Sequence, residues 1–229
     1  MNGASDNLGY NATKVEELSQ AISKIATQTG TEIGEIIEDQ IIVPLGAAWI
    51  APEAVRYIND SFMVTIKHSG EAIAVVYNNF IKSLQADLDL WAETTEGKTT
   101  QLAQINDILI PVNTSFMKEE LGGDVIITKE GCERIIGNLP EIENEIKSKL
   151  EALNSDLEAE VAFIGGGQAQ AIEDCFRSLA AIVRDIFKYL AEDDETSLQT
   201  NIRTACDNWQ RASEAVRDAA QQEASANQG

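Results

Sequence analysis

Two long stretches of helical apolar spacing dominate the chain, and each follows a bend that begins with an aromatic residue. The first bend runs from Trp49 to Pro52, and the second runs from Phe163 to Gly167. After each bend the chain places isoleucine, aspartate and phenylalanine at matching positions: Ile58, Asp60 and Phe62, then Ile172, Asp174 and Phe176. Helices that reverse at a bend bury their apolar faces against each other. The pattern predicts two tandem helical hairpins and favours binding or assembly over catalysis.

The helix before the first bend has a clear expected start and end. Thr13 followed by Glu16 is typical of a helix N-terminus, where the two side chains cap each other's backbone. A stripe of valine, leucine and isoleucine then continues to Ile41. Pro44 and Gly46 predict that this helix ends before Trp49.

The helix after the first bend has a clear expected start but two possible ends. Pro52 suits the first helical position, because its missing N–H has no helical acceptor there. Apolar residues recur at helical spacing as far as Trp91. The helix either breaks at Gly97 or continues along the same pattern, through Leu102, Ile105 and Leu109.

The middle of the chain predicts a connector from Pro111 to Gly131. Two β-like runs, 108–110 and 125–128, either pair as a small hairpin or pack as an extended connector. Asn138 and Pro140 predict the start of the next helix. The expected organisation is a first hairpin over 1–110, a connector over 111–131, a second hairpin over 132–223 and a disordered tail over 224–229.

The last helical region contains a seam in which apolar residues alternate at steps of four and three. It follows an acidic patch, Glu192 to Glu195, and its spacing is that of a coiled coil. The seam consists of Leu198, Ile202, Ala205, Trp209, Ala212, Val216 and Ala219. Its many alanines predict a close helical neighbour.

Charge and hydropathy exclude several classes of partner. The formal net charge is −21, whereas phosphate binding needs clustered lysine and arginine, so nucleic acid is not expected as a partner. The longest uncharged stretch, Gln40 to Pro52, is too short to span a bilayer, so stable membrane insertion is not expected. Met1 to Asp6 lack the basic and apolar regions of a signal peptide. We therefore expect synthesis in the cytoplasm without a cleavable signal.

The sequence lacks the usual arrangements for metal binding and catalysis. His68 is the single histidine, and no Cys-x-x-Cys pair occurs. Three widely spaced cysteines do not form a disulfide framework. The run Gly165 to Gly167 lacks the Gly-Lys-Ser/Thr of a phosphate-binding loop, and no Gly-x-Ser-x-Gly elbow is present. We expect no enzymatic activity, no cofactor and no metal site.

The bends resemble those of the WXG family, small proteins handled by type VII secretion that consist of a helix, a Trp-x-Gly bend and a returning helix. Trp49-Ile50-Ala51 matches the bend with alanine in place of glycine. Phe163-Ile164-Gly165 matches it with phenylalanine in place of tryptophan. Tyr189 and Asp193 have the spacing of the family's Tyr-x-x-x-Asp/Glu secretion element.

The resemblance implies an all-α fold, in which two tandem hairpins form a four-helix bundle, and a non-enzymatic role. Such a protein would be a type VII secretion substrate or the accessory or targeting partner of a secreted effector. Its implied partners are another helical protein, an effector or a secretion ATPase, and a homodimer is also considered. The alternative is a cytoplasmic or phage-related structural protein that self-associates through its amphipathic helices. An α-helical pore-forming component, with 105–128 as its tongue, is less well supported because that segment is short and interrupted.

Overall fold

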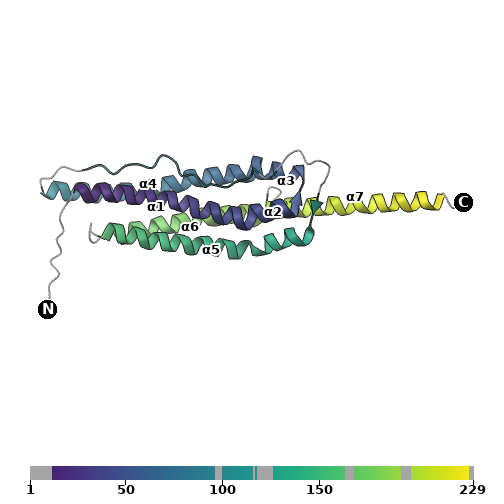
Figure 1. Cartoon of the computed structure of the whole chain (residues 1–229). Helices are drawn as coiled ribbons and strands as arrows, with labels where there is room; N and C mark the ends of the chain where they lie inside the picture. Colours follow the sequence, from purple (N-terminus) through teal and green to yellow (C-terminus); the bar gives the residue numbers. More distant parts are fainter. Residues whose placement is uncertain are drawn as a thin grey trace. The chain divides into compact units, whose positions relative to one another are not determined.

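The computed structural model describes residues 12–95, 100–115, 117, 126–162, 168–191 and 197–226 (Figure 1). The described chain is almost entirely helical, which confirms the all-α fold class. Its elements, in order, are α1 (Ala12–Ile37), the π-helix η1 (Glu38–Ile42), α2 (Val43–Ala48), β1 (Trp49–Ile50), α3 (Pro52–Tyr57), the π-helix η2 (Ile58–Phe62), α4 (Met63–Thr95), β2 (Ile126–Ile127), α5 (Lys129–Val161), α6 (Gln168–Ala191) and α7 (Leu198–Ala226).

The chain divides into two compact units, each built from three separate stretches of sequence. Unit 1 comprises Met1–Ile37, Thr65–Val112 and Glu141–Ile186. Unit 2 comprises Glu38–Val64, Asn113–Pro140 and Phe187–Gly229. Helices α4, α5 and α6 therefore contribute residues to both units.

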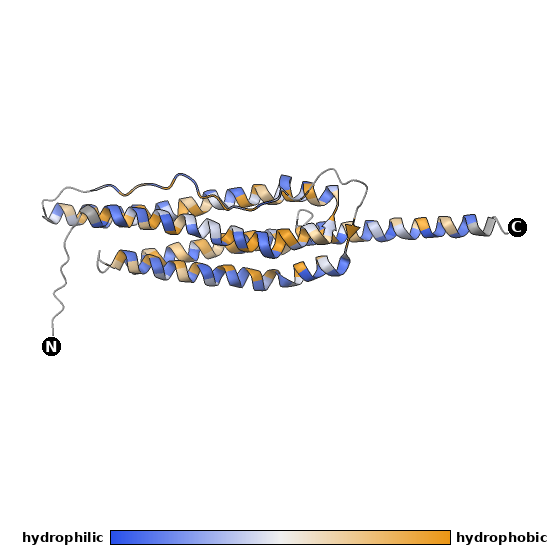
Figure 2. Cartoon of the chain, viewed as in Figure 1, coloured by the Kyte–Doolittle hydropathy of each residue, from blue (hydrophilic) through white to orange (hydrophobic). Residues whose placement is uncertain are grey.

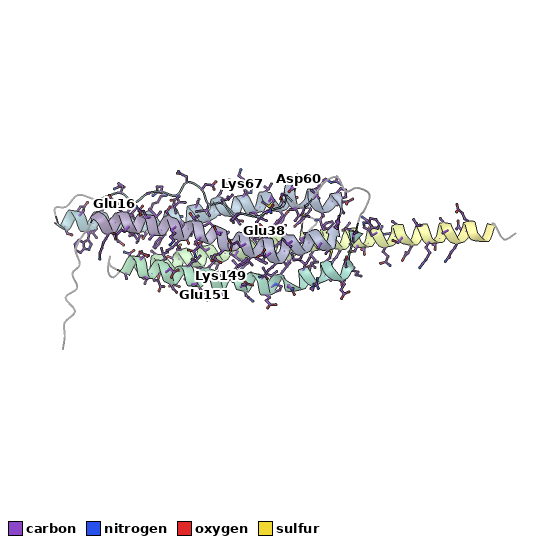
Figure 3. All side chains as sticks on the ribbon, in the orientation of Figure 1. Glu16, Glu38, Asp60, Lys67, Lys149 and Glu151 are labelled. Carbon is purple, nitrogen blue, oxygen red and sulfur yellow. The ribbon has the colours of Figure 1, made fainter. Side chains whose placement is uncertain are left out.

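Side chains from four helices pack together in unit 1. The hydroxyls of Thr29 on α1 and Tyr77 on α4 share a hydrogen bond of 2.7 Å. Lys149 on α5 (Figure 3) forms an ion pair of 3.4 Å with Glu32 on α1. Gln168 on α6 donates to Asp87 on α4 at 2.6 Å.

The apolar stripes expected from the sequence form the core of unit 1. Figure 2 shows apolar and polar residues alternating along its helices. The buried residues include Val15, Leu18, Ile22 and Ile33 of α1, Ile66, Ile81 and Leu84 of α4, Ile142, Ile146, Leu150 and Leu157 of α5, and Ile172, Leu179 and Val183 of α6. Burial of these side chains is the main favourable term in folding of this unit.

Of the two ends considered for the helix after the first bend, the break near Gly97 applies: α4 ends at Thr95, and residues 100–114, which contain Leu102, Ile105 and Leu109, have no helical structure. We call 100–112, the part of this segment in unit 1, the strap. Its Leu102, Ile105, Ile108 and Ile110 are buried, and Leu109 is exposed. Apolar spacing of three residues fits a non-helical chain that contacts a core at intervals as well as it fits a helix, which is why the sequence left both alternatives open.

Polar side chains of α1 and α4 bind the backbone of the strap as a neighbouring strand would. Asn78 accepts from the N–H of Ile105 at 2.8 Å and donates to its carbonyl at 2.7 Å. Gln85 accepts from the N–H of Leu102 at 2.8 Å. Ser19 accepts from the N–H of Ala103 at 2.9 Å. These contacts satisfy backbone groups that would otherwise be buried without partners.

Three helical glycines let the strap approach α1 and α4 closely. A Cβ at Gly30 would lie 2.4 Å from the carbonyl oxygen of Leu109, and one at Gly34 would lie 2.3 Å from that of Pro111. A Cβ at Gly70 would lie 2.1 Å from the carbonyl oxygen of Ile108. Real Cβ atoms do not come so close to backbone oxygens, so these positions require glycine while the strap stays in place.

The strand pair of unit 2 differs from the hairpin considered for the connector. Strands β1 and β2 pair antiparallel, with Trp49 opposite Ile127 and Ile50 opposite Ile126. Run 108–110 belongs to the strap, so the extended alternative applies to it. Because β1 lies at the first bend, the pairing attaches the chain before α5 to that bend.

Two prolines expected to bound helices lie inside helical segments instead. Pro44 sits in the first turn of α2, directly after η1, so helical structure continues to Ala48. The wider turn of a π-helix changes the hydrogen-bond register there, which suits a residue without an N–H. Pro140 lies inside α5, which starts at Lys129 rather than after Asn138. Pro140 is exposed, so water can satisfy the carbonyl that loses its helical donor.

Candidate functional site

The first bend is the best-defined feature among the predicted site residues. Trp49 has only 2% of its surface exposed, and β2 covers its backbone. The N–H of Thr128 donates to the carbonyl of Ala48 at 2.8 Å, just before the strand pair. The Cys132 thiol donates to the same carbonyl at 3.8 Å. Backbone contacts on both sides therefore hold the bend in one conformation.

Ala51 occupies the position that corresponds to the glycine of the Trp-x-Gly bend. Its backbone is extended, with φ −156° and ψ 151°, a conformation that any residue adopts. Its carbonyl accepts from the N–H groups of Ala54 at 3.0 Å and Val55 at 3.3 Å, which starts α3. Since Ala51 is only 1% exposed, the site requires a small side chain rather than a positive φ.

The indole N–H of Trp49 has no hydrogen-bond acceptor among the described residues. A buried donor without a partner costs roughly 1–3 kcal/mol. The indole is nevertheless kept in the core, where a buried aromatic ring contributes a large apolar surface. The geometry therefore assigns Trp49 a packing role at the bend.

Tyr189, the first residue of the predicted secretion element, contacts the first hairpin within unit 2. Its ring stacks on Tyr57 of α3, with centroids 6.5 Å apart and an angle of 12° between planes. Burial, together with the adjacent Tyr189, raises the pKa of Tyr57 well above its usual value, so the Tyr57 hydroxyl stays protonated at physiological pH. Tyr189 itself is half-buried. A helix of the second predicted hairpin thus meets the helix that starts at the first bend.

The other predicted site residues lie outside the described part of the chain. Phe163 and Gly165 of the second bend fall between α5 and α6, and Asp193 falls between α6 and α7. Their assignments stay predictions.

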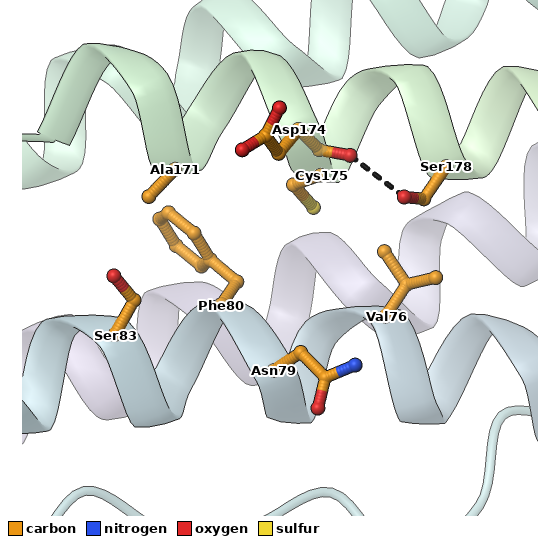
Figure 4. Close-up of a pocket in the computed structure, with 8 residues that line it drawn as sticks. All are labelled: Val76, Asn79, Phe80, Ser83, Ala171, Asp174, Cys175 and Ser178. Atoms are coloured by element: carbon orange, nitrogen blue, oxygen red, sulfur yellow. Dashed lines mark hydrogen bonds between the residues drawn. The ribbon is translucent and has the colours of Figure 1, made fainter.

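A surface pocket of about 320 Å³ lies in unit 1 between α4 and α6 (Figure 4). Val76 and Phe80 point from α4 towards Cys175 on α6, and Ser178 donates to the backbone carbonyl of Asp174 at 2.7 Å. The remaining lining residues are Asn79, Ser83 and Ala171. None of the eight lining residues is a histidine, the usual base for a catalytic thiol, and the carboxylate of Asp174 accepts hydrogen bonds from Gln170 and Arg177.

The cysteines behave as small apolar side chains. All three are free thiols. Burial raises the pKa of Cys175 to about 12, and burial, with smaller effects of Cys206 and Glu133, raises that of Cys132 to about 11. Both are therefore protonated at neutral pH and are poor nucleophiles. Among the described residues no three His, Cys, Asp or Glu side chains are grouped to hold a metal ion, and His68 is exposed on α4.

A second open groove, of about 410 Å³, lies in unit 2 where β2 faces the N-terminal half of α7. Its lining residues are Ile126, Ile127, Lys129, Cys206, Asp207, Trp209, Gln210 and Ser213. Every residue of α7 from 207 to 223 is exposed, including those that line this groove. The close helical neighbour expected for the alanine-rich seam is absent from the described part of the chain.

The chain matches no known family model, no curated protein and no solved structure. In the described ranges, no helix is long and apolar enough to cross a membrane.

The sequence analysis did not identify the residues that bind the strap. Asn78 and Gln85 are polar residues on a mostly apolar helix, and neither belongs to a recognisable motif. The sequence feature that indicates the strap is the pair Gly30 and Gly34. Two glycines one turn apart in a helix indicate that another backbone approaches that face.

Proposed function

We propose that the chain is a non-enzymatic helical binding protein of the WXG type, either a type VII secretion substrate or an accessory partner of a secreted effector. The observation that carries this proposal is the first bend. A buried tryptophan and a buried small residue lie two positions apart, between a helix that ends and a helix that returns. This arrangement is what the resemblance to the WXG family implies.

The backbone at Ala51 supports the proposal despite the missing glycine. Where a bend needs a positive φ, alanine is strained and glycine is required. The extended backbone at Ala51 carries no such strain, and the small methyl group fits its buried position. Alanine is thus physically equivalent to glycine in this bend.

The contacts of unit 1 support a tandem arrangement in which the second hairpin replaces a partner subunit. The Lys149–Glu32 ion pair joins α5 to α1, and the Gln168–Asp87 hydrogen bond joins α6 to α4. In this proposal the two hairpins of one chain form the four-helix bundle that two WXG subunits form together.

The proposed role requires no catalytic group. The Cys175 thiol in the pocket of unit 1 is protonated at neutral pH, since burial raises its pKa to about 12. Partners would instead recognise helix surfaces and, in type VII secretion, the element that starts at Tyr189. The proposed partners are another helical protein or effector and a secretion ATPase.

Tyr189→Ala is expected to weaken recognition of the secretion element. A tyrosine at the centre of a binding site contributes about 2 kcal/mol or more, so export should fall by more than about tenfold. The measurement is the amount of protein in the medium and in cells of the native host. Asp193→Asn, a conservative change outside the described residues, should lower export in the same way.

Tyr57→Leu is the matched control, because it breaks the ring stack without changing the secretion element. Its unfolding midpoint should fall about as much as that of Tyr189→Ala, while its export should stay near the wild-type level. Equal loss of export in both variants would mean that Tyr189 matters only for folding, and this would remove the support that Tyr189 gives to the secretion element.

A further inference from the structure

The C-terminal part of α7 is a helix whose apolar face is uncovered. Trp209 is 41% exposed and Val216 is 71% exposed, although Leu198 and Ile202 at the start of the same helix are buried. A helical segment of this length is marginally stable by itself in water. An amphipathic helix gains most of its stability when another element covers its apolar face.

From residue 205 to residue 220 the uncovered face is continuous and carries only small or apolar residues, and Glu223, one turn after Ala219, is the next residue on the same side. At 3.6 residues per turn one side of the helix bears Ala205, Cys206, Trp209, Ala212, Ser213, Val216, Ala219 and Ala220. Charged residues lie on the opposite side, and these include Asp207, Arg211, Glu214 and Asp218. We call the first set the α7 face. Figure 2 shows how apolar and polar residues alternate along this helix.

The α7 face is self-complementary when two copies run antiparallel. A two-fold axis between Gln210 and Arg211 puts Trp209 of each helix opposite Ala212 of the other. It also puts Val216 opposite Ala205. Each layer then pairs one large side chain with one alanine, so the two helices can approach closely without voids or overlap. A parallel pair would place tryptophan on tryptophan and alanine on alanine.

Charge also favours a second copy as the occupant. Residues 203–223 hold three arginines and four acidic residues, a net charge of −1, whereas the whole chain carries −21. This is therefore a part of the acidic chain where two copies meet without strong repulsion. The same balance argues against an anionic membrane, which attracts helices rich in lysine and arginine.

We infer that the α7 face is a homodimer interface, in which α7 of one chain pairs antiparallel with α7 of a second copy. Trp209 also lines the groove beside β2, and this groove is open to solvent. The partner helix therefore covers the part of Trp209 that the groove leaves exposed. The interface is small, and small interfaces are weak, so the dissociation constant should be on the order of micromolar. This inference is independent of the proposed role in secretion, because it rests on different residues.

Sedimentation velocity of the full chain over a wide concentration range tests the interface. The wild type should shift from monomer to dimer with rising concentration. Ala212→Glu places a charge opposite Trp209 of the second copy and should weaken dimerisation by more than about tenfold. Thr204→Glu adds the same charge on the other side of the helix and should dimerise like the wild type.

Disulfide crosslinking tests the antiparallel direction in a Cys206→Ser background. The two remaining thiols, Cys132 and Cys175, are buried, which protects them from the oxidant. A mixture of the Ala205→Cys and Val216→Cys variants should crosslink under mild oxidation, while either variant alone should not. A parallel pair would crosslink each variant with itself, which contradicts the proposed geometry.

Three other results would overturn the inference. The first is a wild type that stays monomeric at every concentration. The second is a dimer that Ala212→Glu does not weaken. The third is a monomer whose α7 binds anionic vesicles, as judged by flotation, because the occupant of the face would then be a membrane surface.

Discussion

Gly70→Ala is expected to lower the thermal unfolding midpoint by about 2–4 °C, although alanine is the better helix former. The added Cβ would lie 2.1 Å from the carbonyl oxygen of Ile108, so the strap or α4 must move. Forced overpacking of this kind costs about 1–3 kcal/mol, which outweighs the gain of up to about 1 kcal/mol in helix propensity. Cleavage of the strap in limited proteolysis should also become faster.

Gly137→Ala is the matched control for this prediction. Gly137 is also helical, but a Cβ there meets nothing within 4 Å. This variant should raise the midpoint by about 2–4 °C, since only the helix propensity changes. If Gly70→Ala were stabilising to the same extent, the strap would not lie against α4 as described.

Trp49→Ala is expected to destabilise unit 2 by about 3–5 kcal/mol, because it empties a fully buried aromatic site at the first bend. Trp49→Phe should cost less than about 2 kcal/mol. The smaller ring loses contacts, but it also removes an indole N–H that has no acceptor among the described residues. Chemical denaturation followed by circular dichroism measures both values.

Trp209→Ala provides the comparison at dilute concentration. Its indole is 41% exposed on α7, so the free energy of unfolding should change by less than about 0.5 kcal/mol. Similar losses for Trp49→Ala and Trp209→Ala would show that the first bend is not packed as the structure has it.

The buried faces of the helices could be predicted from the sequence, because the spacing of apolar residues along a helix reflects which face is buried. Ile142, Ile146 and Leu150 recur at helical spacing because one face of α5 is buried, and all three are in the core. Pro52 was expected at the first position of a helix, and α3 does start there, three residues after Trp49.

The ends of the helices were harder to predict, because tertiary contacts override local signals there. Asn138 and Pro140 together look like a helix start, yet Cys132 and Ile135 are buried and begin α5 about two turns earlier. Helical structure ends at Ala48, before Trp49 as expected, but Pro44 lies within it directly after η1. These residues are compatible with the first turn of a helix, but their presence does not determine where the helix begins or ends.

The strap could not be recognised from its own residues. Leu102, Ile105 and Ile108 fit both a helix and an extended segment in which every third residue is buried. The helical and the extended alternative are distinguished only by the surface of α4 against which the strap packs. There Asn78 binds the strap backbone in place of a strand partner, and Gly70 leaves room for that backbone. The pairing of β1 with β2 was missed for the same reason, because both partners of a short ladder must be known before either is identified.

The most direct test of the proposed function compares the native host with a strain that lacks the type VII secretion ATPase. We predict that the protein appears in the medium of the native host and is confined to cells in the strain without the ATPase. Export that is equal in the two strains, or protein that stays inside cells while other type VII substrates are exported, would contradict it.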